Sequence, residues 1–328
     1  MQTITKNCVD TCSPKRNRRV VVVGSRGRLG TTLVQCLKSI DYVVFDYDRD
    51  HLDLGSETSI MRALEPIEYD ELILTGALTG VDYCERHAKE AHAVNAVAPR
   101  IIAEISAAKM AHVTYISTDM VFNGLNEKPY TENDKPDPIS IYGASKLDGE
   151  VGILSASKDN LILRVSWVFG PGRPAFPEWI IAKSCYEHEL SLPADKYCCP
   201  TYTIDLVNWL SALLFSTGSK PASGVFHLCN SSPCSWLEWG HFCVTTAIEE
   251  GFPVLTGDIQ GVSMHSIAAF LAKRPVYSAL DTSKLTEISG IRPRDWREAV
   301  RDHVILSPTF KKYSSAVQET SPVDNGHE

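Results

Sequence analysis

The stretch from Val20 to Lys38, VVVVGSRGRLGTTLVQCLK, decides the fold class of this 328-residue chain. Its four consecutive valines predict a strand that is buried on both faces, and the residues from Thr31 to Lys38 predict a helix. Gly24, Gly27 and Gly30 lie between them, at a strand-to-helix turn. Glycines let backbone amides approach phosphate groups closely, and a helix N-terminus adds free N–H donors. The pattern therefore predicts that a dinucleotide diphosphate binds at this turn.

The charged side chains near the turn leave the choice of dinucleotide open. Asp46 follows Gly24 by twenty-two residues, at the end of the second predicted strand, where a carboxylate binds the adenosine ribose and repels a 2′-phosphate. Arg26 has the opposite effect, because a guanidinium pairs well with a phosphate. We therefore expect NADPH or NADH as the cofactor, with Arg28 and Leu29 completing the turn that holds it.

Apolar runs alternate with helical stretches between residues 19 and 170, a pattern typical of parallel strands joined by crossover helices. None of these runs shows the polar alternation of a half-exposed strand, so both faces of the sheet should be covered. The predicted strands are Val20 to Val23, Tyr42 to Phe45, Glu71 to Leu74, His112 to Ile116 and Leu161 to Val165. The expected fold is α/β, a Rossmann-type doubly wound parallel sheet.

A smaller, discontinuous C-terminal substrate lobe is expected after residue 170, where prolines become frequent. A helix from Ile204 to Phe215 and a strand from Val225 to Leu228 are predicted to return to the sheet. The predicted division assigns 19–170 to the dinucleotide-binding domain, with 203–230 returning to it, and 171–202 and 231–310 to the lobe. Residues 1–18 and 311–328 are predicted to be a disordered leader and tail.

A second group of residues suits proton transfer. Thr118 ends the fourth predicted strand, and Tyr142 and Lys146 stand four residues apart at the start of a helical stretch, hence on one helix face. Strand ends of a parallel sheet meet at one edge, which would bring these residues to the glycine turn. An ammonium beside a phenol is expected to lower the pKa of Tyr142, so that it exchanges a proton with a substrate oxygen.

Composition argues against several other classes of protein. The formal charge of −8 gives no support to nucleic-acid binding, and no uninterrupted apolar run approaches the ~18 residues of a membrane helix. Ten cysteines and ten histidines show no metal-ligand spacing, so no metal is expected. No secretory signal follows Met1, and we expect a cytoplasmic protein.

A long ordered series of segments resembles the extended short-chain dehydrogenase/reductase superfamily, and within it the dTDP-4-dehydrorhamnose reductases. The resemblance spans roughly Arg19 to Val300. Beyond the glycine turn it includes TGALTGVDYCE from Thr75, YISTDMVFNG from Tyr115, KPYTENDKPDPISIYGASKLDGE from Lys128, LRVSWVFGPG from Leu163 and RPVYSAL from Arg274. Such enzymes of dTDP-L-rhamnose synthesis reduce the 4-keto group of a nucleotide-linked 6-deoxy sugar.

The resemblance implies a role for each matching residue. Thr118 would hydrogen-bond the sugar ketone, Tyr142 would donate a proton to its oxygen, and Lys146 would hold the nicotinamide ribose. Asp119 and Trp167 would contact the substrate. Three residues would line the cofactor after the third strand: Thr75, Gly76 and Ala77.

Two departures from the family pattern touch the substrate side. Met120 stands where a tyrosine is common, and Lys196 stands where a glutamine is usual after the aspartate that matches Asp195. Two alternatives therefore stay open: a nucleotide-sugar epimerase or dehydratase of the same superfamily, and a non-catalytic NADP-binding regulatory subunit similar to the methionine adenosyltransferase β subunit. A homodimer is compatible with the resemblance, although no residue pattern requires one.

Overall fold

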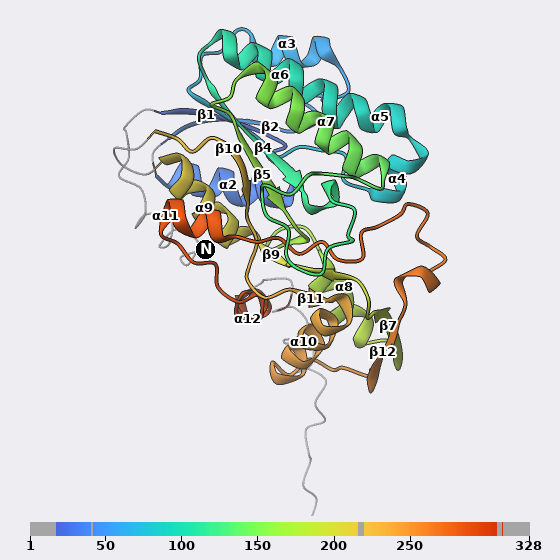
Figure 1. Ribbon diagram of the computed structural model, residues 1–328. Helices are drawn as coiled ribbons and strands as arrows, with labels where there is room; N and C mark the ends of the chain where they lie inside the picture. The colour runs from blue at the N-terminus through green and yellow to red at the C-terminus, as the bar shows by residue number, and fades with distance from the viewer. Residues whose placement is uncertain (1–17, 41, 216–219, 307–309, 311–328) are drawn as a thin grey trace, which may run out of the picture.

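The computed structural model describes residues 18–40, 42–215, 220–306 and 310, and its centre is a parallel sheet of six strands (Figure 1). Their order across the sheet is β10-β5-β4-β3-β1-β2. The strands span Arg19–Val23 (β1), Val43–Tyr47 (β2), Glu71–Leu74 (β3), His112–Thr118 (β4), Leu161–Val165 (β5) and Gly224–His227 (β10). This confirms the predicted doubly wound α/β fold, and the chain changes its winding direction between β1 and β3.

Helices cover both faces of the sheet, because alternate residues of each strand point to opposite sides. Val20 and Val22 face one hydrophobic cluster, and Val21 and Val23 face another. The first cluster lies under α2 (Arg28–Ser39), α9 (Thr203–Phe215) and α11 (Ser283–Ser289). The second lies under α3 (Glu57–Leu64), α6 (Ala98–Ala108) and α7 (Ile141–Ala156).

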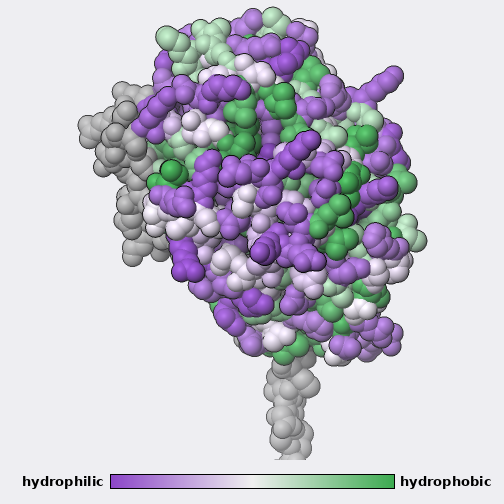
Figure 2. Space-filling view, viewed as in Figure 1, coloured by the Kyte–Doolittle hydropathy of each residue, from purple (hydrophilic) through white to green (hydrophobic). Residues whose placement is uncertain are grey.

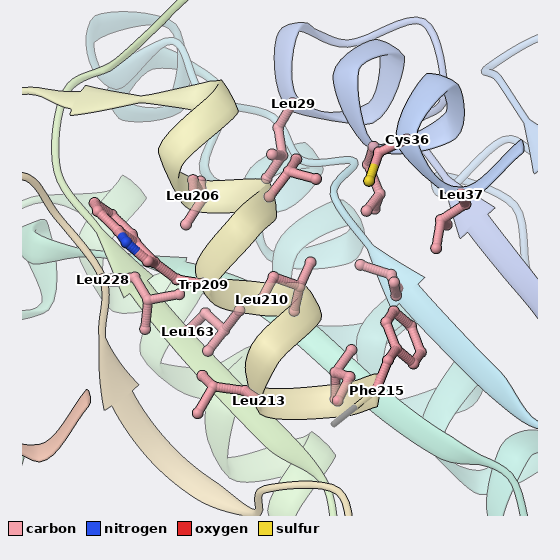
Figure 3. Close-up of a cluster of buried hydrophobic side chains, with 14 of the residues drawn as sticks. Leu29, Cys36, Leu37, Leu163, Leu206, Trp209, Leu210, Leu213, Phe215 and Leu228 are labelled. Atoms are coloured by element: carbon pink, nitrogen blue, oxygen red, sulfur yellow. The ribbon is translucent and has the colours of Figure 1, made fainter. Parts of the chain in front are cut away.

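Helix α9 is the element that brings the chain back to the sheet. Figure 3 shows its leucines in one cluster with side chains of α2 and with Leu163 of β5. Strand β10 then pairs in parallel with β5, with Gly224 opposite Leu161 and His227 opposite Arg164. The predicted helix and strand in this region are both present.

The smaller lobe is built from short strands and three helices below the sheet (Figure 1). Its cluster of buried side chains is rich in aromatic residues, including Phe169, Trp239 and Trp296. The helices are α8 (Phe176–Ser184), α10 (Trp236–Glu249) and α12 (Trp296–Leu306). The strands are β6 (Val168–Phe169), β7 (Glu189–Pro193), β8 (Tyr197–Cys198), β9 (Thr201–Tyr202), β11 (Cys234–Ser235) and β12 (Asp258–Val262).

The segment between β3 and β4 is divided into several short helical pieces. It forms α4 (Val81–Arg86), α5 (Ala88–His92), a π-helical turn, η1 (Ala93–Val97), and then α6. Pro99 stands in the first turn of α6, where the missing N–H of a proline is tolerated. The side chain of Asn95 in η1 bonds both backbone groups of Leu78 and the Ser145 hydroxyl, and so joins three segments of the chain.

A long connection after β12 crosses from the lobe back to the sheet domain, and we call residues 263–280 the strap. Its 3-10 turn, η3 (Met264–Ser266), is followed by an irregular chain that reaches α4 (Figure 1). There Arg274 pairs with Asp82, with Nη2 to Oδ2 at 2.6 Å, and the Ala272 amide donates to the same carboxylate at 2.9 Å. The strap therefore fastens the two parts of the molecule together.

No helix among the described residues is both long enough and apolar enough to cross a bilayer. The face seen in Figure 2 mixes hydrophilic and hydrophobic residues, with the hydrophilic ones predominant. In the same described ranges, no group of three or more potential ligand side chains could hold a metal ion. The predicted leader and tail lie outside the described residues, except for Arg18, which pairs with Glu71.

Candidate active site

The glycine turn lies at the switch point of the sheet, between the carboxyl ends of β1 and β3. Gly24 has a φ of +87°, and a Cβ on it would come within 2.6 Å of Gly76 backbone atoms. Only glycine fits there, because both the backbone angle and the close approach exclude a side chain. Gly27 is the N-cap of α2 and no side chain caps the helix, so the first N–H groups of α2 are open to a ligand.

A crevice of about 910 Å³ runs along this edge of the sheet, large enough for a dinucleotide and a second ligand. Of the predicted site residues, all but Gly30 and Asp46 line it. The lining set is Gly24, Arg26, Gly27, Arg28, Leu29, Thr75, Gly76, Ala77, Thr118, Asp119, Tyr142, Lys146 and Trp167. Gly30 lies inside α2, against the backbone of Gly24.

The three residues predicted for proton transfer meet at one end of the crevice, which we call the catalytic end. Thr118 ends β4 and is 5% exposed, while Tyr142 and Lys146 lie in the first turns of α7 and are 8% and 1% exposed. Ser140 caps α7 by accepting the Gly143 amide at 3.2 Å. A side chain at position 143 would collide with the Met120 carbonyl, so the glycine there lets α7 start close to the end of β4.

The Tyr142 hydroxyl is held in its protonated form. Burial raises its pKa well above the usual value, a hydrogen bond with Thr118 lowers it, and the nearby charge of Asp119 raises it. The sequence-based expectation of a lowered pKa is therefore wrong for the protein by itself, because desolvation outweighs any effect of Lys146. A protonated phenol suits a group that donates a proton to a developing oxyanion.

Lys146 is the second perturbed group of the site. Its ammonium donates to the Ile116 carbonyl at 2.7 Å and lies 3.8 Å from the centre of the Tyr115 ring. Burial lowers its pKa to about 7, and the charge of Glu150 opposes this shift. Since an ammonium has three protons and the protein takes one by this bond, the other two are available to a ligand in the crevice.

Glu150 is a residue of this site that the sequence reasoning missed. It lies four residues after Lys146, so Tyr142, Lys146 and Glu150 share one face of α7. Its carboxylate binds Arg164 in β5 at 2.7 and 2.9 Å and accepts the Ser117 hydroxyl at 2.5 Å. These bonds fix α7 against β4 and β5; the spacing of four in Tyr142-Lys146-Glu150 was the available signal.

At the other end of the crevice, the acidic residue is Asp48 rather than Asp46. Strand β2 continues to Tyr47, two residues beyond its predicted end, so the residue that leaves the strand toward the crevice is Asp48. Arg26 pairs with Asp48 at 2.7 Å and with Asp50 at 3.3 Å. Asp46 instead pairs with Lys38 at 2.9 Å and borders a separate hollow of about 330 Å³.

Arg28 lines the crevice, but backbone carbonyls occupy its guanidinium. It donates to Val168, Arg173 and Pro174 at 3.0, 3.2 and 2.6 Å. These carbonyls belong to the segment that leads into the lobe. Arg28 therefore ties the cofactor turn to that segment, which sequence spacing could not indicate.

The two residues predicted to contact the substrate differ in how they meet the crevice. The Asp119 carboxylate bonds Thr118, Ser166 and Ser278, so its oxygens are directed to protein partners. Trp167 has a left-handed backbone, with a φ of +44°, and its ring packs 4.3 Å from that of Trp236. Trp239 and Phe176 continue this aromatic wall into the crevice.

Comparison with known proteins identifies the family. The RmlD substrate binding domain family matches residues 18–306. The chain belongs to this family. It is 35% identical over 286 residues to the spore coat polysaccharide biosynthesis protein SpsK of Bacillus subtilis, covering 87% of this chain and 96% of the relative. It is 31% identical to a dTDP-4-dehydrorhamnose reductase of Sinorhizobium fredii, covering 86% of this chain and 95% of that one.

Among solved structures, a dTDP-4-dehydrorhamnose reductase from Bacillus anthracis in complex with NADP superposes with a TM-score of 0.81 at 30% identity. The match covers 88% of this chain and 99% of that one. Family membership makes the chain an NAD(P)-dependent oxidoreductase, as its sequence predicted. The narrow cradle at Gly24 and the uncapped N-terminus of α2 fit the diphosphate of such a cofactor.

Proposed function

We propose that this protein reduces the 4-keto group of a nucleotide-linked 6-deoxy sugar, with dTDP-4-dehydro-L-rhamnose giving dTDP-L-rhamnose as the substrate pair. The observation that carries the proposal is the meeting of Thr118, Tyr142 and Lys146 in one crevice with the glycine turn. The relatives named as dTDP-4-dehydrorhamnose reductases support the choice of sugar. SpsK shares more sequence with the chain, and its name states no substrate.

The chain's own residues account for the proton side of this reduction. A bound reduced nicotinamide would supply the hydride, that is, the two electrons and one hydrogen that the ketone carbon gains. Tyr142 gives its hydroxyl proton to the carbonyl oxygen as negative charge develops there, and so becomes a phenolate that solvent must reprotonate. Thr118, whose one proton goes to Asp119, hydrogen-bonds Tyr142 and so positions that hydroxyl for the substrate oxygen.

The remaining residues hold and enclose the reactants. Lys146 is anchored at the Ile116 carbonyl and directs its free N–H groups into the crevice, where the nicotinamide ribose would lie. Asp48 lines the opposite end, where the adenosine ribose would lie, and its carboxylate orders Arg26 and the backbone of Asp50 and His51 there. The wall of Trp167, Phe176 and Trp239 offers an apolar surface to the sugar and excludes water from the reacting atoms.

A panel of nucleotide sugars tests the proposal. The purified full chain is mixed with NADPH and, in turn, with dTDP-4-dehydro-L-rhamnose, its 4-hydroxy product and a UDP-linked hexose. Loss of nicotinamide absorbance with the keto sugar alone, together with formation of dTDP-L-rhamnose, is the expected result. An epimerase or dehydratase would convert a sugar without net NADPH loss. A regulatory subunit would bind NADPH without turnover of any sugar.

A further inference from the structure

A buried network behind the catalytic end of the crevice joins the lobe to the sheet domain. Lys196, which directly precedes β8, is 0% exposed and is not part of the crevice lining. Its Nζ donates to the Ser278 hydroxyl at 2.7 Å and to the Tyr197 carbonyl at 3.2 Å. The Ser278 hydroxyl, on the strap, donates to Asp119 Oδ2 at 2.5 Å. An ammonium of the lobe thus reaches a carboxylate at the end of β4 through one hydroxyl.

The same carboxylate fixes the Thr118 hydroxyl. Oδ2 of Asp119 also accepts Ser166 at 2.9 Å, and Oδ1 accepts Thr118 at 3.1 Å. Thr118 in turn accepts the Met120 amide at 3.2 Å and bonds Tyr142. A hydroxyl has one proton and two lone pairs, so the orientation of Asp119 decides which way Thr118 presents its proton.

Charge balance gives Lys196 a reason to be buried. An uncompensated ammonium or carboxylate is costly in the interior, and Asp119 is itself only 2% exposed. Burial lowers the pKa of Lys196, whereas the Asp119 charge raises it, as expected for two opposite charges that stabilise each other. The other groups that act on Lys196 are Cys198, Cys199 and Arg274.

The charge of Asp119 also reaches Tyr142, whose pKa it raises in addition to the effect of burial. Groups from two packed elements act on this phenol: Thr118, Asp119 and Tyr115 of β4 and its end, and Cys84 of α4. Lys146 and Glu150 follow Tyr142 at spacings of four residues on α7 itself. Removal of the Lys196 charge would leave the Asp119 carboxylate without its nearby positive charge. The carboxylate would then favour the protonated form of Tyr142 more strongly.

We propose that Lys196 is a positioning residue for the reduction: acting through Ser278, its ammonium holds the Asp119 carboxylate in the orientation that receives the Thr118 proton, and thereby sets the position from which Thr118 orients the Tyr142 hydroxyl toward the substrate oxygen. The inference rests on the proposed function. It also accounts for the departure at this position, because the glutamine usual in the family could bond Ser278 but would carry no charge.

The test compares Lys196→Met, which removes the charge and the hydrogen bond, with Lys196→Gln, which removes only the charge. Lys284→Met is the matched control, because Lys284 also donates to a backbone carbonyl, the partly buried one of Val225 at 2.6 Å, but lies outside the crevice lining. For each folded variant, kcat and KM are measured against pH with NADPH and the keto sugar. The NADPH Kd and the melting temperature are measured in parallel.

We expect Lys196→Met to lower kcat about tenfold, while the KM for the keto sugar and the NADPH Kd change by less than about twofold. Lys196→Gln keeps a hydrogen bond to Ser278 and should lose less of kcat. In an Asp119→Asn background, Lys196→Met should lower kcat by less than about twofold more, because Lys196 acts through that carboxylate. If Lys196→Met does not fold, the glutamine variant decides.

The outcomes separate the inference from the function on which it rests. Wild-type kcat in both Lys196 variants, with only the melting temperature lowered, would mean that Lys196 is merely structural and would overturn the inference alone. Absence of any keto-sugar reduction by the wild-type chain would overturn the proposed function, and the inference with it. A similar loss of kcat in Lys284→Met, or a full tenfold loss from Lys196→Met in the Asp119→Asn background, would also overturn the inference, because the effect would then not depend on the network.

Discussion

The two ends of the crevice differ in how far water reaches them. At the catalytic end, Tyr142 and Lys146 are 8% and 1% exposed, so water hardly reaches them. At the adenosine end, the Arg26 side chain is 67% exposed and shares its charge between Asp48 and Asp50. Buried polar groups are worth more because water cannot replace a lost partner, whereas exposed charge pairs are screened. Substitutions at the catalytic end should therefore change turnover or binding more than substitutions at the adenosine end.

The largest effect is expected at Tyr142. Tyr142→Phe removes the proton donor but keeps the ring, so kcat should fall by ~100-fold or more while the NADPH Kd changes by less than about twofold. Stopped-flow turnover and fluorescence titration of NADPH measure the two quantities. A variant that retains the wild-type rate would remove Tyr142 from the mechanism.

Lys146 should make cofactor binding depend on pH. Its pKa of about 7 means that the ammonium prevails below pH 7 and the neutral amine above it. Because the ammonium is the form that binds ribose hydroxyls and attracts phosphates, affinity should weaken as pH rises through 7, by up to ~10-fold per unit.

Titration with NADH between pH 6 and 9 checks this dependence, since NADH has no 2′-phosphate of its own to titrate. Lys146→Met should bind weakly and show a nearly flat profile across the same range. Equal slopes for the variant and the wild type would place the titrating group elsewhere.

A smaller effect is expected at the exposed end. Arg26→Ala should weaken NADPH binding ~3- to 10-fold, affect NADH less, and leave kcat unchanged, because the guanidinium, although paired with Asp48 and Asp50, is 67% exposed and within reach of a 2′-phosphate but not of the proton-transfer residues. The effect should shrink as salt is added. Arg62→Ala, an exposed arginine of α3 outside the crevice lining, is the control. Equal losses for both cofactors would exclude a phosphate contact.

The smallest effect distinguishes two neighbouring carboxylates. Asp46→Asn should change the Kd of either cofactor by no more than about twofold, because Asp46 pairs with Lys38 outside the crevice. Asp48→Asn should weaken NADH binding more, since it removes a crevice-lining carboxylate that orders Arg26 and the turn at Asp50 and His51. Reversed effects would restore the role that the sequence suggested for Asp46.

The sheet and the catalytic end could be predicted from sequence because their signals are local. A valine run, a glycine turn and a tyrosine four residues before a lysine each lie within one element, and parallel topology alone brings them together. The position of Asp48 was missed because a strand end cannot be placed within two residues by propensity. Lys196 and Ser278 were not connected, since they are 82 residues apart and meet only through the packing of the strap.

The division into a dinucleotide-binding domain and a substrate lobe stays a prediction, since sequence marks the change at residue 170 but not how firmly the parts are joined. The substrate also stays a proposal for a physical reason. The aromatic wall is assembled from Trp167, Phe176 and Trp239, which lie on separate elements. Their spacing in sequence carries no signal of a shared surface.

The ion pair between Arg274 of the strap and Asp82 of α4 restricts how the lobe can move when the crevice releases its product. The Arg274 side chain is 9% exposed, and the bond from Arg274 lowers the pKa of Asp82, so the pair persists at neutral pH. Any outward swing of the lobe must therefore either break this bidentate contact or carry α4 with it. Product release is therefore expected to proceed with the strap still bound to α4, and not by free rotation of the lobe away from the sheet domain.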